Sequence, residues 1–156
     1  MKPCFPHSPK ALYLALAILA AITATVAFAA EPSPIGRWRT IDDKTGAESG
    51  LVEITQAGDA LVGRIVKIIP LAGDPVDPVC ARCDGPEKNQ RVLGMTILKG
   101  FKRDGEKWGG GTILDPRSGY IYRSELRLAD GGRTLLVRGY IGISLLGRTV
   151  TWQRDE

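Results

Sequence analysis

Eight short runs rich in β-branched, aromatic and aliphatic residues, separated by Gly, Asp and Pro turn sequences, dominate the chain from residue 36 onward. None of these runs has helical spacing long enough to indicate an amphipathic helix. The turns are specific: Ala57-Gly58-Asp59-Ala60 is typical of a hairpin, and Asp115-Pro116 suits a type I turn. The sequence therefore predicts an all-β protein. The expected strands are Gly36–Ile41, Leu51–Gln56, Leu61–Ile69, Met95–Lys102, Trp108–Leu114, Tyr120–Leu128, Thr134–Ile141 and Thr149–Arg154.

Eight antiparallel strands joined in chain order close most simply as an up-and-down barrel, because closure removes the unpaired edges of an open sheet. The interior of such a barrel is either filled by side chains or wide enough for one small ligand. Side-chain alternation places Val150, Trp152 and Arg154 on one face of the last strand. We expect a single barrel domain over residues 30–156.

Residues 1–29 have the anatomy of a signal peptide. Lys2 and Lys10 supply a positively charged region before an apolar segment, and Ala27-Phe28-Ala29 predicts cleavage between Ala29 and Ala30. An uncleaved membrane anchor is the alternative, since the apolar segment is about long enough to span a bilayer. The Ala- and Thr-rich second half and the cleavage site favour the signal peptide. We expect a periplasmic or secreted product with no stable membrane insertion after cleavage.

Loss of this segment changes the chemistry that the chain can perform. The formal net charge falls from +4 to +2, because Lys2 and Lys10 are lost and every acidic residue stays. With no basic cluster, this small excess argues against a nucleic-acid partner. The only histidine, His7, is lost as well, which excludes a Ser-His-Asp triad and imidazole metal ligands. We therefore expect a binding protein rather than an enzyme, and predict no cofactor and no metal.

Gly36-Arg37-Trp38 at the head of the first strand and Arg154 in the last resemble a pattern of the calycin superfamily, which comprises lipocalins and fatty-acid-binding proteins. In that superfamily the Trp plugs the closed end of the barrel and a basic side chain packs across its ring. The resemblance implies structural roles for Trp38 as the plug and Arg154 as its cover. A guanidinium over an indole gains a cation–π contact, which agrees with this pairing. An ordinary core Trp and an ordinary surface Arg are the alternative.

A second set of residues is spread over nearly the whole chain from Gly36 to Arg154. Its members are Gly36-Arg37-Trp38, Cys80-Ala81-Arg82-Cys83, Trp108-Gly109-Gly110-Gly111 with Asp115-Pro116, Gly119 with Tyr120 and Tyr122, Val137-Arg138-Gly139-Tyr140, Gly147-Arg148 and Trp152. In this set the chain is similar to a secreted bacterial family of unknown function, numbered 2147 among such domains. The resemblance implies no particular activity.

A long loop at residues 70–92 holds Cys80 and Cys83, the only cysteines beyond the signal segment. An even number of cysteines in an exported protein is typical of a disulfide. A redox centre is less favoured, because the surrounding Pro and Gly argue against a helix that would stabilise a thiolate. A metal site is the third alternative, but the aspartates of the loop are a poor ligand set for zinc.

Residues suited to ligand contact lie in the second half of the chain. Aromatic rings with polar tips, together with an arginine, suit a lipid-like molecule with an anionic head group. The candidates are Trp108, Tyr120, Tyr122, Arg138 and Tyr140. The tyrosines would equally suit the core or the rim of a barrel that binds nothing.

Three functions remain. We favour an exported barrel that binds a small apolar or amphipathic ligand. The alternative is a barrel with a filled interior that engages another envelope protein as an inhibitor or adaptor. An enzyme is the third, either thiol-redox through Cys80 and Cys83 or hydrolytic through carboxylates such as Glu53 or Glu125. A large apolar cavity would favour ligand binding, and a packed interior would count against it.

Overall fold

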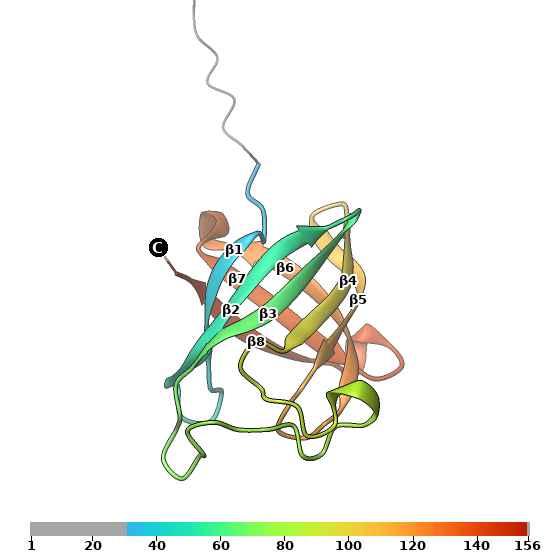
Figure 1. Cartoon of the computed structure of the whole chain (residues 1–156). Coiled ribbons are helices and arrows are strands. Elements are labelled where there is room, and N and C mark those ends of the chain that lie inside the picture. The colour runs from blue at the N-terminus through green and yellow to red at the C-terminus, as the bar shows by residue number, and fades with distance from the viewer. Residues whose placement is uncertain (1–30, 156) are drawn as a thin grey trace, which may run out of the picture. The chain divides into compact units, whose positions relative to one another are not determined.

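The computed structural model describes residues 31–155, so the expected signal peptide and its cleavage site lie outside the described residues. Eight strands form one closed antiparallel barrel in chain order (Figure 1). The all-β, eight-stranded fold expected from the sequence is thus confirmed. The strands are β1 (Gly36–Ile41), β2 (Glu48–Ala57), β3 (Ala60–Ile68), β4 (Thr96–Asp104), β5 (Lys107–Leu114), β6 (Ile121–Ala129), β7 (Thr134–Tyr140) and β8 (Arg148–Arg154). Short 3-10 turns are η2 (Gly85–Glu87), η3 (Asp130–Gly132) and η4 (Ser144–Leu146). Within the described residues, no helix is long and apolar enough to cross a membrane.

Two strand boundaries differ from the expected ones in ways that affect the site. β6 begins at Ile121, because Tyr120 still belongs to the preceding turn: its carbonyl accepts a hydrogen bond of 2.9 Å from the Asp115 backbone N–H. β8 begins at Arg148 instead of Thr149. Arg148 therefore continues the alternation of Val150, with both side chains on the inner face.

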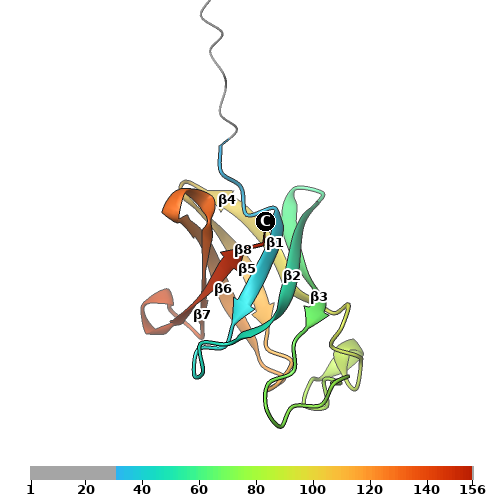
Figure 2. The same ribbon diagram turned by 90° about the vertical axis from the view of Figure 1, so that its left-hand side faces the viewer.

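The barrel closes where β1 pairs with β8. Trp38 lies directly opposite Arg154, and Thr40 lies opposite Trp152. Directly opposed residues of an antiparallel pair share a face, so Trp38 and Arg154 meet on the inner face of the closure. Figure 2 shows β1 and β8 side by side at this seam.

Large side chains fill the middle of the barrel because two glycines of the flanking strands make room for them. A Cβ at Gly63 would lie 2.7 Å from Leu98 Cδ1, and a Cβ at Gly111 would lie 2.5 Å from the Phe101 ring. Leu98 and Phe101, both on β4, therefore pack directly against the backbones of β3 and β5. The apolar side chains of the barrel interior that are at most 2% exposed are Trp38, Val52, Ile54, Leu98, Phe101, Leu126, Leu135 and Val137.

The two ends of the barrel differ in their connections. The closed end carries the β2–β3, β4–β5 and β6–β7 hairpins, together with residues 33–35 and the C-terminal end of β8. The open end carries the β1–β2 turn, the long loop of residues 69–95, the β5–β6 turn and the β7–β8 loop. In Figure 2 the long loop and the β7–β8 loop project from opposite sides of the open end.

Candidate functional site

At the closed end, Arg154 covers Trp38. The guanidinium carbon lies 4.2 Å from the centroid of the Trp38 ring, which is fully buried. The guanidinium donates hydrogen bonds to the carbonyls of Gly132 (2.7 Å), Ile35 (3.2 Å) and Ser33 (2.7 Å). Three hydrogen bonds of this guanidinium are thus made within the fold, which gives the pair a structural role.

Gly36 is required by the same contact. Its φ is +129°, and a Cβ at this position would lie 3.0 Å from Arg154 Nη1. A side chain here would therefore meet both a strained backbone and the guanidinium. Burial lowers the pKa of Arg154, yet an arginine stays protonated throughout the physiological range.

Trp108 lies on the inner face of β5 near the closed end. It is 8% exposed, belongs to the hydrophobic core, and has the Arg103 guanidinium carbon 5.5 Å from its ring centroid. β5 runs from the closed end to the open end, and Trp108 is its second residue. The structure therefore does not bring Trp108 together with Tyr120 and Tyr122, which lie at the open end.

The long loop folds onto the outside of the barrel. Cys80 and Cys83 form the disulfide expected from the sequence, and both are buried, at 0% and 1% exposure. Cys80 Sγ lies 3.2 Å from the Pro116 carbonyl oxygen, and a Cβ at Gly119 would overlap the Arg82 carbonyl. Gly119 has φ +78°, so glycine both forms this turn and lets the disulfide segment lie against it. The disulfide-bonded segment thus packs against the β5–β6 turn and holds the loop there.

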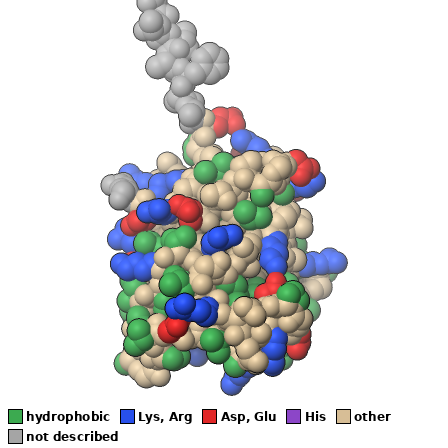
Figure 3. Space-filling view, viewed as in Figure 1, with side chains coloured by type: hydrophobic (Ala, Val, Ile, Leu, Met, Phe, Trp, Pro, Cys, Tyr) green, Lys and Arg blue, Asp and Glu red, His purple; other side chains and the backbone are tan. Residues whose placement is uncertain are grey.

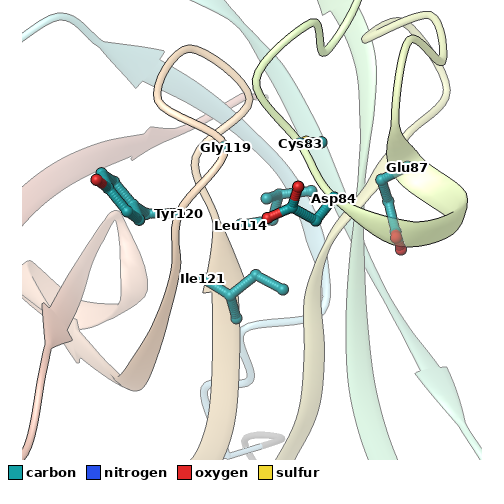
Figure 4. Close-up of a pocket in the computed structure, with 7 residues that line it drawn as sticks. All are labelled: Cys83, Asp84, Glu87, Leu114, Gly119, Tyr120 and Ile121. Atoms are coloured by element: carbon teal, nitrogen blue, oxygen red, sulfur yellow. The ribbon is translucent and has the colours of Figure 1, made fainter.

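A pocket of about 220 Å³ lies between this loop and the outer wall (Figure 4). This is below the size of typical small-molecule sites. The Tyr120 ring points away from the other lining side chains in Figure 4. A second, more open depression of about 380 Å³ lies on the loop itself, within residues 86–95. Neither lies inside the barrel. The lining residues of the first pocket are Cys83, Asp84, Glu87, Leu114, Gly119, Tyr120 and Ile121.

Three carboxylates of the loop form ion pairs, with basic side chains of β4, of the β5–β6 turn and of the loop itself. Glu87 Oε1 accepts a hydrogen bond of 2.7 Å from Lys99 Nζ on β4, which lowers the pKa of Glu87. Asp74 pairs with Arg117 at 2.6 Å, and Asp77 with Arg91 at 2.9 Å. Among residues 31–155, no group of three or more His, Cys, Asp or Glu side chains is arranged to hold a metal ion.

At the open end, the inner wall is apolar and only partly buried. Ile113 and Tyr122 are direct cross-strand partners, and both approach Gly139 of β7: a Cβ there would lie 3.5 Å from Tyr122 Cβ and 3.7 Å from Ile113 Cγ2. Ile65, Ile113 and Val150 pack against the core but remain partly exposed. The Tyr120 and Tyr122 rings meet edge to face, with centroids 6.3 Å apart. This inner wall is the candidate binding surface.

Arg148 supplies a positive charge at the rim of this wall. It lies opposite Gly139 on the inner face of β8, and its side chain is 68% exposed. Its partner is Asp43 in the β1–β2 turn. An anionic group placed against the wall would therefore find a guanidinium beside it.

Arg138 and Tyr140 lie on the outer face of β7. Arg138 is opposite Glu125 and Thr149, and alternates with the buried, inward-facing Val137. Its guanidinium donates hydrogen bonds to the carbonyls of Ser144 (2.8 Å) and Leu145 (3.2 Å) and to Thr149 Oγ1 (3.0 Å). Arg138 thus shapes the β7–β8 loop, and neither residue belongs to the inner wall.

Ser124 lies one pleat deeper than Tyr122 on β6. It is fully buried between Gly111 and Gly139 on the neighbouring strands. Its hydroxyl has no hydrogen-bond partner among the described residues. Buried hydroxyls are usually paired, so this group is the polar exception in the apolar floor of the open end.

Charges are mixed over the barrel surface. On the face presented in Figure 3, Lys and Arg side chains are interspersed with acidic and hydrophobic ones. Electrostatic features of the site are therefore local, and arise from individual residues such as Arg148.

Comparison with known proteins places this fold and these residues in a family. Residues 36–154, which include all eight strands, match the family described as "Uncharacterized protein conserved in bacteria (DUF2147)". The chain belongs to the DUF2147 family. No curated protein matches the chain.

Among solved structures, this DUF2147 barrel is similar to protein HP1028 from the human pathogen Helicobacter pylori, described as belonging to the lipocalin family. The two are 17% identical, with a TM-score of 0.67, and the match covers 80% of this chain and 84% of that one. At this identity the likeness concerns the fold, which is a lipocalin-like barrel.

Arg148 is a site residue of this DUF2147 barrel that the expected strand boundaries left out. The signal was present, since Arg148 continues the period-two series of Val150, Trp152 and Arg154. Placing the start of the last strand one residue too late removed it from that series. Gly139 and Ile113, which lie beside Tyr122, were also not singled out, because cross-strand register is needed to bring them together.

Proposed function

We propose that this protein binds a small amphipathic molecule with an anionic head group at the open end of the barrel. The observation that carries the proposal is the partly exposed apolar inner wall of Tyr122, Ile113, Val150 and Ile65. Equivalent positions deeper in the barrel are fully buried. A short acyl chain bound on this wall would remove its apolar surface from water. This burial would contribute favourable hydrophobic free energy to binding.

The filled interior limits how the ligand sits. Leu98 and Phe101 occupy the middle of the barrel, so the binding mode that we propose is shallow, with the chain at the mouth and not in a deep cavity. Arg148 would hold the anionic group, which would displace Asp43 from its present ion pair. Tyr120 and Tyr122 would offer the ring faces and hydroxyls of an amphipathic rim.

Calorimetric titration with dodecanoate, dodecanol and dodecyltrimethylammonium tests the proposal. We expect dodecanoate to bind most tightly. Tyr122→Ser should weaken all binding by about tenfold, whereas Arg148→Gln should weaken only dodecanoate. Asp43→Asn should strengthen dodecanoate binding, because the competing carboxylate is gone. Tyr140→Ser, on the outer face, is the matched control. Equal affinities for the three head groups would overturn the anionic specificity, and no binding would overturn the proposal.

A second candidate is the protein-interaction module, and the filled middle of the barrel favours it. Native mass spectrometry of protein taken from its own cellular compartment, followed by extraction, separates the two functions. A co-purifying amphiphile supports ligand binding. A protein partner without any amphiphile supports the interaction module.

We also propose that the protein is exported and acts in the periplasm or the medium. The signal-like residues 1–29 support this, as does a disulfide buried against the barrel, since disulfides persist in oxidising compartments. Mass spectrometry of the N-terminus of the fractionated protein tests it. A chain that begins at Ala30 outside the cytoplasm is expected, and an intact cytoplasmic chain would contradict the proposal.

A further inference from the structure

The β7–β8 loop, residues 141–147, presents an unusually apolar tip. Four of its side chains are largely exposed: Ile141 (74%), Ile143 (61%), Leu145 (83%) and Leu146 (80%). The segment reads Ile-Gly-Ile-Ser-Leu-Leu-Gly and contains no charged residue. In Figure 2 the loop projects from the side of the barrel. Exposed apolar clusters of this kind mark interaction surfaces.

The exposure is built into the loop by its hydrogen bonds. The Arg138 guanidinium donates hydrogen bonds to two carbonyls of the loop. The Gly147 N–H donates a hydrogen bond of 3.0 Å to the Ser144 carbonyl of the η4 turn. A Cβ at Gly147 would lie 2.7 Å from the Gly139 carbonyl and 2.9 Å from Tyr140 Cβ, so glycine lets the loop pack closely on β7. This framework fixes the loop backbone while Leu145 and Leu146 stay outside.

The surroundings of the loop are basic. Two of the four arginines between Gly131 and Arg154 lie beside the loop, and this stretch contains no acidic residue. Arg138 and Arg148 flank the loop, and Arg123 on β6 lies opposite Tyr140, the residue before it. Two acidic groups lie nearby: Asp43 pairs with Arg148, and Glu125, opposite Arg138, lies 3.2 Å from Lys107. An apolar tip with Arg123 and Arg138 on the adjoining outer face is complementary to an anionic lipid surface.

We propose that the loop of residues 141–147 docks the barrel onto a bilayer that contains anionic phospholipid. Ile143, Leu145 and Leu146 enter the interfacial region, and Arg123 lies at the level of the head groups. A projecting tip suits a deformable bilayer, which needs no matching concave surface. This docking is independent of the proposed ligand site, because the loop tip and Arg123 lie outside the inner wall.

Depth-dependent fluorescence quenching reports the position of the loop directly. Ile143→Trp and its matched control Val76→Trp, at an 83% exposed site of the long loop, place one solvent-exposed indole on each side of the open end. The native Trp38, Trp108 and Trp152 are at most 8% exposed and give a constant background. Vesicles of phosphatidylcholine and phosphatidylglycerol (3:1) with brominated acyl chains should blue-shift and quench position 143 but not position 76. Because residues 1–30 are present in both variants, any lipid affinity of their own does not decide the result.

Flotation of the full-length chain with unbrominated vesicles of the same composition gives the energetic test. Leu145→Ser/Leu146→Ser should weaken partitioning at least tenfold relative to the control Val76→Ser/Val79→Ser. Arg123→Gln should weaken it about fivefold with anionic vesicles and leave neutral phosphatidylcholine vesicles unaffected. Near-UV circular dichroism verifies that each variant is folded. Equal quenching at positions 143 and 76 would overturn the proposal. The proposal would also be overturned if Leu145→Ser/Leu146→Ser dissociated an oligomer of the chain and left vesicle binding unchanged.

Discussion

Arg154 stacks over Trp38 and closes the barrel at the same time. Its guanidinium carbon lies 4.2 Å from the ring centroid, while its nitrogens bind the carbonyls of Gly132, Ile35 and Ser33. One side chain therefore joins the β6–β7 hairpin, the segment before β1 and the core. Trp38 Nε1 adds a hydrogen bond of 2.7 Å to the Pro34 carbonyl, so both partners hold the same segment.

Arg154→Ala should destabilise the barrel by about 2–4 kcal/mol, because it removes the cation–π contact and leaves three carbonyls without this donor. Arg154→Lys should lose less, since it keeps the charge but not the planar fork. Urea unfolding measures both. Arg127→Ala, at an exposed position on β6, is the control and should change the free energy of unfolding by less than about 0.5 kcal/mol. A similar result for the two alanine variants would show that the stack does not stabilise the fold.

Gly111→Ala should destabilise the barrel by about 1–3 kcal/mol, because the new methyl group meets the Phe101 ring. Gly109→Ala in the same strand is the control, since its nearest neighbour would be 4.0 Å away. A double-mutant cycle with Phe101→Leu isolates the contact: the smaller side chain should relieve part of the clash, so the two costs should not add. Additive costs would mean that the ring does not lie against Gly111.

The strand number and closure followed from the sequence because the period of two and the turn residues are local signals. The sequence did not decide whether side chains fill the interior. Whether Leu98 faces Gly63 depends on cross-strand register, which bulges shift: the β3–β4 ladder is irregular around Gly63, and the β5–β6 ladder between Trp108 and Gly111. The local sequence pattern does not predict these shifts in register.

The candidate site was only partly predictable for a related reason. Both faces of β7 carry apolar residues, as Leu135, Leu136 and Val137 show, so alternation alone could not decide whether Arg138 and Tyr140 face inward. Tyr122 was named, and the structure places it on the inner wall. The direction in which the long loop folds depends on tertiary packing of the disulfide against the β5–β6 turn, and no local pattern encodes it.

Ser124→Ala should raise the free energy of unfolding by about 1 kcal/mol, because the native hydroxyl is buried without a partner among the described residues. Ser49→Ala is the matched control, because the Ser49 hydroxyl lies 2.9 Å from Thr40 Oγ1 and should cost stability when removed. Thermal unfolding shows whether each substitution raises or lowers the stability of the protein. A destabilised Ser124→Ala variant would indicate that the hydroxyl makes a favourable interaction in solution.

Cys80→Ala/Cys83→Ala should cost roughly 2 kcal/mol, the value expected for so short a ring, and should leave the barrel folded. Because both sulfurs are buried, reduction of the native disulfide by dithiothreitol should be slow, and should accelerate only under conditions that open the loop. Mass spectrometry of alkylated thiols follows the reaction. Rapid reduction of the folded protein would contradict the packed position of the disulfide and reopen a redox function.

Acid should weaken the attachment of the long loop to β4, because the Glu87 carboxylate accepts a hydrogen bond from Lys99 on that strand. The hydrogen bond from Lys99 lowers the pKa of Glu87 below its ordinary value. A carboxyl group whose pKa is lowered by folding stabilises the folded state above its unfolded-state pKa, and this contribution is lost as the pH falls through the lowered pKa.

Lys99→Met should return the pKa of Glu87 to its ordinary value. Lys102→Met should leave Glu87 unchanged and instead raise the pKa of Asp59, which is lowered mainly by its hydrogen bond with Lys102. Carboxyl NMR titrations of the two variants test both arms, and a Glu87 pKa that responds equally to the two substitutions would show that no specific Lys99 contact holds the loop.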